Sequence, residues 1–500
     1  MRSVSYGELL RTNPNFRNLL AGQFISELGN WFNFIAGLGL VRLVSDASPT
    51  AAGIFFVARL LPFALMSPIA GTFVDRFSRR KVMIATDVIR AIVALSFLLV
   101  HDANQLWIAY LATVVLHTTG AFFEGAKNAA TPNLTGKQGL LAGTALMFST
   151  RFLLMAVGSA LGGWASAEFG YQVAFIINAV SFLVSAYSVW LIPEDAMRAK
   201  NGHVSVSSQA IVGSPSSPPY ERGVDAEAGD SSFGRQVGSY ADVAQDDHTA
   251  RLKSTPSARS HHPVAEAATP LLRQEGSGGH PSFVRRGASE ERPSFVTELR
   301  EGLRYSWQNH FALTILIMNM IWATGGGSIN IVFERIGGVR FAGSEGWNPD
   351  IAVAILWTAT GLGLTVGMLI AHRTSIILDR RKWNHGFIGW TLIVHGVLFS
   401  IAGVMPTLVL WAVFVFVSRV IVGVEYAVQE TAFQRSLPDY IRGRISTLDR
   451  GAELTIFGLS SYAAAEAMRF ITPETLTILS GVLSALAGVV WFVRERSPKE

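Results

Sequence analysis

The feature that most limits the fold of this chain is a series of apolar runs, each about as long as a bilayer-spanning helix. A hydrocarbon core of about 30 Å is crossed by about 20 apolar residues in an α-helix. Half of the 500 residues are apolar and 15% are charged, whereas soluble proteins carry about 25% charged residues. Runs with few charges cover residues 85–100, 140–165, 173–192, 387–404 and 476–493. The pattern predicts an all-α polytopic membrane protein.

We expect about twelve membrane-spanning helices in two sets of six. The first set covers residues 16–44, 49–74, 82–100, 105–128, 140–167 and 171–192, and the second covers residues 310–336, 350–372, 384–404, 407–435, 445–469 and 473–493. An N-terminal half, residues 1–192, and a C-terminal half, residues 309–494, follow from this division. Because each half has an even number of spans, both halves would have the same orientation, as in parallel-repeat transporters.

A long polar segment, residues 193–294, separates the two halves. It is rich in Ser, Gly, Pro and charged residues and lacks apolar periodicity. Such a segment buries too little apolar surface to offset the entropy of ordering, so we predict a disordered cytoplasmic loop. Residues 295–308 regain an amphipathic pattern, which predicts an interfacial helix whose apolar side carries Val296, Leu299, Leu303 and Trp307.

The distribution of Lys and Arg predicts the orientation of the spans. Basic residues gather on the side that holds both termini and the central loop, while the other side has only Arg42, Arg335, Arg340 and Arg469. Positive charge favours the cytoplasmic side. Both termini, including a short tail of residues 495–500, are therefore expected in the cytoplasm, in either a plasma membrane or an organelle membrane.

A short loop between the second and third predicted spans carries the sharpest motif. Residues 71–81 read GTFVDRFSRRK. Gly71 would permit close backbone packing at a helix end, and Asp75 could pair with the basic cluster or with the positive end of a neighbouring helix. We expect this loop to control movement of the halves through Gly71, Asp75, Arg76, Arg79, Arg80 and Lys81.

With this motif the chain resembles the major facilitator superfamily, whose hallmark loop has the same order of Gly, Asp and basic residues. Further positions resemble its branch of macrolide-type drug exporters and siderophore exporters. They include Asn13, Phe16, Arg17, Leu61, Pro62, the pair Asp87 and Arg90, and the run from Pro438 to Arg444. The resemblance implies the major facilitator fold, two six-helix bundles, and secondary transport by alternating access. It covers nearly the whole chain outside the central loop.

Ionisable residues inside spans are the candidates for the transport pathway. Charges are costly in lipid, so such residues usually face a partner or a water-filled space. The candidates are Glu27, Arg59, Glu124, Arg151, Arg419, Glu425 and Glu430, beside the one-turn pair of Asp87 and Arg90. One hypothesis is that Glu27, together with Glu124, couples proton movement to solute movement. The alternative is a structural ion pair such as Glu27 with Arg59.

The sequence favours a secondary active transporter of a small organic solute, with proton-coupled efflux as one form. The alternatives are an uncoupled facilitator and a transporter-like sensor that signals through the central loop. The chain contains no cysteine, which excludes disulfides and thiolate metal sites. No catalytic constellation, phosphate-binding loop or metal-ligand pattern occurs. We therefore expect no enzyme activity, cofactor, metal or nucleic acid, and a monomer whose partners are the solute, the bilayer and, with coupling, protons.

Overall fold

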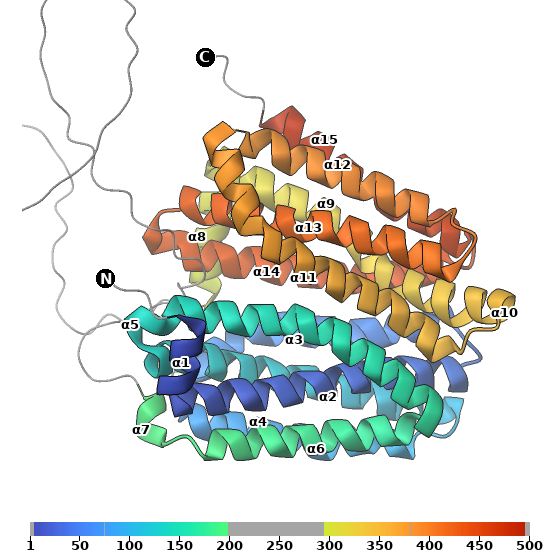
Figure 1. Cartoon of the computed structure of the whole chain (residues 1–500), viewed down its shortest axis with the longest axis horizontal. Helices are drawn as coiled ribbons and strands as arrows, with labels where there is room; N and C mark the ends of the chain where they lie inside the picture. Colours follow the sequence, from blue (N-terminus) through green and yellow to red (C-terminus); the bar gives the residue numbers. More distant parts are fainter. Residues whose placement is uncertain (1–4, 75, 199–294, 382, 496–500) are drawn as a thin grey trace, which may run out of the picture. The chain divides into compact units, whose positions relative to one another are not determined.

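A computed structural model describes residues 5–74, 76–198, 295–381 and 383–495, which form helices joined by short connections (Figure 1). No strand occurs among the residues in these ranges. Inside a bilayer no water can bind the backbone, so the N–H and C=O groups of a spanning segment must pair within that segment. The all-α prediction is confirmed for this part of the chain. The predicted central loop lies outside the described residues, apart from residues 193–198.

The N-terminal half consists of helices joined by short connections. Its elements are α1 (Tyr6–Thr12), α2 (Pro14–Val44), α3 (Pro49–Val74), α4 (Arg79–Leu95), η1 (Ser96–Leu99), η2 (Ala103–Gln105), α5 (Leu106–Phe169), α6 (Tyr171–Trp190) and α7 (Glu194–Met197). The side chain of Asn13 accepts a hydrogen bond from Phe16 N at 2.9 Å, which caps α2. Gly136 has a φ of 65°, which favours glycine, and it divides α5 into two helices.

The C-terminal half repeats this order of helices. Its elements are α8 (Phe295–Gln308), α9 (His310–Arg335), the π-helical turn η3 (Ile336–Phe341), α10 (Ala342–Glu345), α11 (Pro349–Arg381), α12 (Asn384–Ala402), α13 (Leu408–Ser436), α14 (Asp439–Ala467) and α15 (Pro473–Arg494). Helix α8 covers the segment predicted to be amphipathic, and Leu303 and Trp307 are exposed on it. Its place at a membrane interface stays a prediction.

Ten segments among the described helices are long and apolar enough to cross a membrane. They lie on α3, α4, both parts of α5, α6, α9, α11, α12, α13 and α15. Helices α2 and α14 have 31 and 29 residues but are not among these segments. Both carry ionisable residues in their interior, such as Glu27 on α2 and Asp449 on α14. That α2 and α14 also cross the membrane, which would give the expected total of about twelve spans, therefore stays a prediction.

The packing of helices within the two halves follows one pattern. In the N-terminal half α2 packs on α5 and α6, and α4 packs on both of them. In the C-terminal half α9 packs on α14 and α15, while α12 packs on α13 and α15. Across the halves, α3 contacts α14 and α5 contacts α11. These pairs correspond under a twofold exchange of the halves, as expected for two parallel repeats.

Helices α11 and α13 approach each other closely at two glycines. A Cβ atom on Gly367 would lie 2.4 Å from the carbonyl oxygen of Val420 and 2.8 Å from Cα of Gly423. A Cβ atom on Gly423 would lie 2.8 Å from the carbonyl oxygen of Leu364. Small residues of this kind let helix backbones approach in membranes, where van der Waals packing drives association.

We expect Gly367→Val to lower the free energy of unfolding by about 1–3 kcal/mol, because the added carbons meet backbone atoms that cannot move aside. Thermal unfolding in detergent, followed by tryptophan fluorescence, measures the change. Gly120→Ala is the matched control, since no described atom lies within 4 Å of a Cβ at Gly120. Alanine is the better helix former, so the control should melt at the same or a higher temperature. Equal losses in both variants would contradict the close contact.

Candidate functional site

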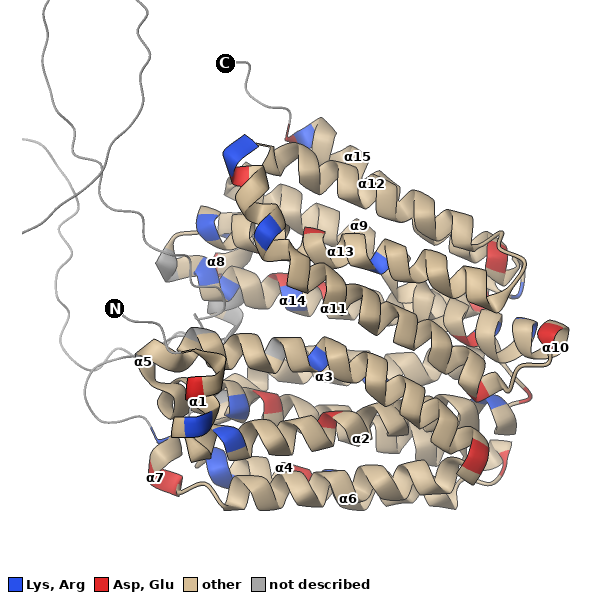
Figure 2. Ribbon diagram, in the orientation of Figure 1, with Lys and Arg blue, Asp and Glu red and all other residues tan. Residues whose placement is uncertain are grey.

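Charged residues gather toward the two ends of the helices, with fewer along their length (Figure 2). At one end a buried network joins the two halves. Arg42, near the end of α2, donates hydrogen bonds to both Glu334 carboxylate oxygens at 3.2 and 3.1 Å, and it also binds Asp350. The three side chains are only 9%, 4% and 8% exposed. We call these three residues the Arg42 network, and this end of the helices the Arg42 end.

Further contacts hold the halves together at the Arg42 end. Arg335 of α9 donates to the backbone carbonyl of Ala47. The Thr50 hydroxyl at the start of α3 donates to Glu466 of α14 at 2.7 Å, and Arg469 donates to Thr50 at 3.3 Å. These bonds join residues of the N-terminal half to residues of the C-terminal half, so the Arg42 end of the bundle is closed.

The burial of residues along α2 also indicates that the Arg42 end is closed. Every residue from 32 to 41 is buried, whereas residues 14–31 alternate between buried and exposed positions. Helix α9 is likewise buried over residues 325–334. The halves therefore pack tightly around these two helices near the Arg42 end. Sequence reasoning missed this closure, because Arg42 was considered only as a charge that reports orientation.

Aromatic rings from both halves meet next to the Arg42 network. Phe34 lies about two turns before Arg42 on α2, and its ring centroid is 5.1 Å from that of Trp357 on α11. Trp357 also contacts Phe333 of α9 at 5.2 Å. The guanidinium of Arg59 lies over the Phe34 ring, 4.3 Å from its centroid. Arg59, a predicted pathway residue, thus lies beside the interhalf aromatic contact.

Several predicted pathway residues lie together in the N-terminal half. Glu27 and Arg151 are the charged neighbours of Arg59, and Arg151 is also a neighbour of Glu124. Lys127 forms a 2.7 Å ion pair with Glu124. We call these five residues the N-half cluster.

The alternative ion pair between Glu27 and Arg59 is not formed in this structure. Glu27 instead accepts a hydrogen bond from the Asn30 amide at 3.4 Å. Arg59 has no hydrogen bond or ion pair with any described residue, and its guanidinium lies over the Phe34 ring. An unpaired guanidinium inside a membrane protein is costly. Arg59 is thus left without a carboxylate in direct contact in this structure.

A second cluster lies in the C-terminal half. The Asn319 amide of α9 donates to both carboxylate oxygens of Asp449 at 3.1 Å, and Gln429 donates to Asn319 at 2.8 Å. Arg450 forms a 2.7 Å ion pair with Glu453. Asp449 was missed in the sequence, although a carboxylate inside a predicted span was a signal that could have identified it.

The predicted pathway residue Glu430 belongs to the same cluster. It accepts a hydrogen bond from Gln434 at 2.6 Å, and it is a charged neighbour of Asp449, as is Glu453. We call Glu430, Asp449, Arg450 and Glu453 the C-half cluster.

The predicted pathway residues Arg419 and Glu425 lie elsewhere on α13. Both side chains are buried at 4% exposure. Arg419 lies 5.5 Å from the Phe399 ring centroid, and Oε1 of Glu425 has no hydrogen-bond partner among the described residues. Nearby, Nδ1 of His395 and the Ser418 hydroxyl are 2.6 Å apart. Since α13 packs on α11 and α12, these groups are part of the interior of the C-terminal half.

The predicted pair on α4 is fully enclosed. Asp87 is 0% exposed and Arg90 5% exposed, and the two side chains form an ion pair. The guanidinium of Arg90 lies between the rings of Phe123 and Phe182, 4.5 and 4.4 Å from their centroids. This arrangement joins α4 to α5 and α6 inside the N-terminal half.

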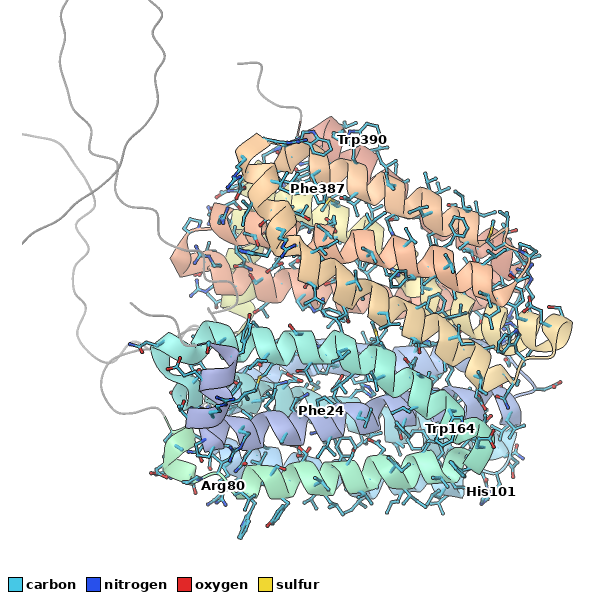
Figure 3. The ribbon with its side chains drawn as sticks, in the orientation of Figure 1. Phe24, Arg80, His101, Trp164, Phe387 and Trp390 are labelled. Carbon is cyan, nitrogen blue, oxygen red and sulfur yellow. The ribbon has the colours of Figure 1, made fainter. Side chains whose placement is uncertain are left out.

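The predicted gating loop binds its own half in this structure. Arg79 donates to the carbonyl oxygen of Met197 at 2.9 Å, and Arg80 donates to that of Trp190. Figure 3 shows Arg80 at the end of the helices that carries α7, with His101 at the opposite end. A hydrogen bond from Ser78 lowers the pKa of Glu194 on α7, so this carboxylate stays ionised beside the basic residues.

Other members of the loop motif make fewer contacts. Arg76 is exposed, and the side chain of Lys81 is also exposed near Glu194. Asp75 lies outside the described residues. The close packing expected at Gly71 is wrong for this structure, since no described atom lies within 4 Å of a Cβ placed there. The close approach of α3 to α5 lies instead at the preceding residue, where a Cβ placed on Gly125 would be 3.5 Å from Cβ of Ala70.

No group of three or more His, Asp or Glu side chains in the described part of the chain could hold a metal ion. The N-half and C-half clusters instead offer charged groups and amides, and the Phe34 ring lies beside the N-half cluster. Such groups can bind an organic solute through hydrogen bonds, ion pairs and stacking, and they hold no arrangement of nucleophile and base.

Comparisons with known proteins agree with this geometry. The sequence model described as "Major Facilitator Superfamily" matches residues 19–452. A relative from Bacillus subtilis (strain 168), "Uncharacterized MFS-type transporter YfiS", is 30% identical over 192 residues, which is 38% of this chain and 45% of the relative. "Putative bacilysin exporter BacE" from Bacillus subtilis is 31% identical over 200 residues, 40% of this chain and 47% of the relative. The chain thus spans about half the length of these relatives.

Solved structures share the fold at low sequence identity. The nucleoside transporter NupG has a TM-score of 0.60 and 12% identity, over 97% of this chain and 100% of that one. A bacterial homologue of the iron transporter ferroportin, in an inward-facing state, has a TM-score of 0.57 and 13% identity, over 96% of this chain and 98% of that one. These likenesses show the fold of the two halves.

Proposed function

Because this chain belongs to the Major Facilitator Superfamily, we propose that it is a secondary active transporter that exports a small organic solute by alternating access. The observation that carries the proposal is the closed Arg42 end, together with two polar clusters on the helices that meet between the halves. A solute held between these clusters would be reached from one side at a time. The relative named for bacilysin export supports the outward direction.

The distribution of basic residues supports a cytoplasmic location for both termini and for the central loop of residues 193–294. With this orientation the Arg42 end faces away from the cytoplasm. The structure would then represent the state that is closed to the outside. In this state the loop of residues 71–81 binds α6 and α7, and we propose that it contacts the C-terminal half in the opposite state.

Proton coupling through Glu27 is part of the proposal. Glu27 is half-buried, has no cation as a direct partner, and lies close to Arg59. We propose that this carboxylate carries the coupled proton. Solute and proton would then compete for the same group of charges between the halves.

Glu27→Gln is expected to abolish transport driven by a pH gradient, because the amide cannot carry a proton, while membrane insertion and thermal stability remain. Solute flux into vesicles, with and without an imposed pH gradient, measures the effect. Glu168→Gln, an exposed residue at the end of α5, is the control and should keep the gradient dependence. If Glu27→Gln retains full gradient-driven flux, this residue has no coupling role. If the unaltered protein moves solute equally without a gradient, the protein is an uncoupled facilitator.

A further inference from the structure

The N-half cluster and the C-half cluster have excess charge of opposite sign. In the N-half cluster three cations, Arg59, Lys127 and Arg151, are accompanied by two carboxylates. In the C-half cluster one cation, Arg450, is accompanied by the carboxylates of Glu430, Asp449 and Glu453. These signs follow from residue identity and from the contacts already described.

Two cations of the N-half cluster, Arg59 and Arg151, have no direct ion pair with a described carboxylate. Lys127 is already paired with Glu124. Arg59 lies over the Phe34 ring and near Glu27, and Arg151 is exposed. Neither side chain forms a hydrogen bond or ion pair with a described residue. Guanidinium groups are well suited to bind carboxylates in pairs of parallel hydrogen bonds. The N-terminal half therefore offers a site for an anionic group.

Amide side chains hold one carboxylate of the C-half cluster in position. Asn319 holds the Asp449 carboxylate, and Gln429 in turn holds Asn319. A carboxylate has about four acceptor sites, so Asp449 can still accept hydrogen bonds from an ammonium group. Arg450 is paired with Glu453 and leaves Asp449 and Glu430 without a cation in direct contact. The C-terminal half therefore offers a site for a cationic group.

The two sites lie on either side of one interhalf contact. Helix α3 carries Arg59 and packs on α14, where a Cβ atom at Gly458 would lie 3.3 Å from Cβ of Leu60. Leu60 follows Arg59 directly, and Glu453 precedes Gly458 by little more than one turn of α14. Arg59 and Glu453 thus lie near the same contact of α3 with α14, and Asp449 lies about one further turn along α14.

On the basis of the transport function proposed above, we infer that the solute is amphoteric. Its anionic group binds Arg59 and Arg151 of the N-terminal half, and its cationic group binds Asp449 of the C-terminal half. Such a solute would neutralise the one excess positive charge of the N-half cluster and one of the two excess negative charges of the C-half cluster. A purely cationic or purely anionic molecule would compensate the charge of only one cluster.

The test uses three forms of one aromatic dipeptide, phenylalanylalanine, in vesicles that contain the full chain. The free dipeptide carries both charges, its N-acetyl derivative only the negative charge, and its C-terminal amide only the positive charge. We expect the free dipeptide to cross about tenfold faster, or more, than either derivative, because each derivative loses one charge-assisted contact. Equal or faster flux of a derivative overturns the inference, and so does the absence of flux for all three forms.

Two variants separate the proposed sites. Asp449→Asn should remove the preference over the N-acetyl derivative and keep the preference over the amide. Arg151→Gln should do the reverse, and Glu168→Gln should change neither ratio. A merely structural role would lower all three fluxes together, so identical shifts in both variants overturn the inference. The transport function itself fails only if neither end of the bundle changes its accessibility during turnover, which labelling of single cysteines introduced at buried positions measures separately.

Discussion

Replacement of Arg42 by alanine is expected to open the Arg42 end of the bundle and to stop transport. In the closed state Arg42 is the shared cation of Glu334 and Asp350, and all three are nearly inaccessible to water. Removal of one partner from a buried ion pair costs about 3–5 kcal/mol, because the remaining charges stay buried and unpaired. When this end opens, water can hydrate both carboxylates. The equilibrium between closed and open states should therefore shift by about 10²–10⁴-fold.

Cysteine labelling measures this shift directly. The chain has no cysteine, so a single Ile331→Cys substitution creates one reporter at a fully buried position of α9. In detergent, its reaction with a maleimide should become about 10²-fold faster or more when Arg42→Ala is added, since the reaction requires opening.

Arg340→Ala provides the matched control at the same end. Arg340 and Glu474 form a 3.1 Å ion pair with both side chains 31% exposed. Such exposed pairs contribute about 0–1 kcal/mol, so the labelling rate should change only a few-fold. Similar rates in the Arg42→Ala and Arg340→Ala proteins would show that burial of the network does not hold the halves together.

Arg90→Ala is expected to lower the free energy of unfolding by about 3–5 kcal/mol, since it leaves the Asp87 carboxylate buried without its cation. Asp87 is 0% exposed, and Arg90 also contacts the rings of Phe123 and Phe182. The substitution thus removes an ion pair and two cation–π contacts from the junction of α4, α5 and α6. Thermal unfolding of the purified protein in detergent measures the loss.

A double variant tests whether the buried charge is the cause. Asp87→Leu with Arg90→Met replaces both charges by apolar side chains of similar volume. Replacement of a complete buried ion pair in this way is often nearly neutral. The double variant should therefore recover most of the stability that Arg90→Ala loses. If it melts as early as the single variant, packing of these side chains, and not an unpaired charge, explains the loss.

Local features of the sequence predicted the helices and the family. Long apolar runs were sufficient to identify most of the spans, because insertion into lipid and backbone pairing within a helix are properties of a single segment. The ion pair of Asp87 and Arg90 could also be predicted from the sequence, since side chains one turn apart on a helix are neighbours. Helix α14 shows the limit of this reasoning, because its charged residues make it too polar to be recognised as a membrane span from composition.

Tertiary structure alone decided the contacts on which the proposed function depends. Arg42 is separated from Glu334 by 292 positions and from Asp350 by 308, and Asn319 is separated from Asp449 by 130. No local pattern specifies such partners. The sequence determined which segments become helices and which side chains carry charge. Packing of the two halves determined which charges are paired, which are buried and which are left for a ligand, because those outcomes depend on neighbours brought together only by folding.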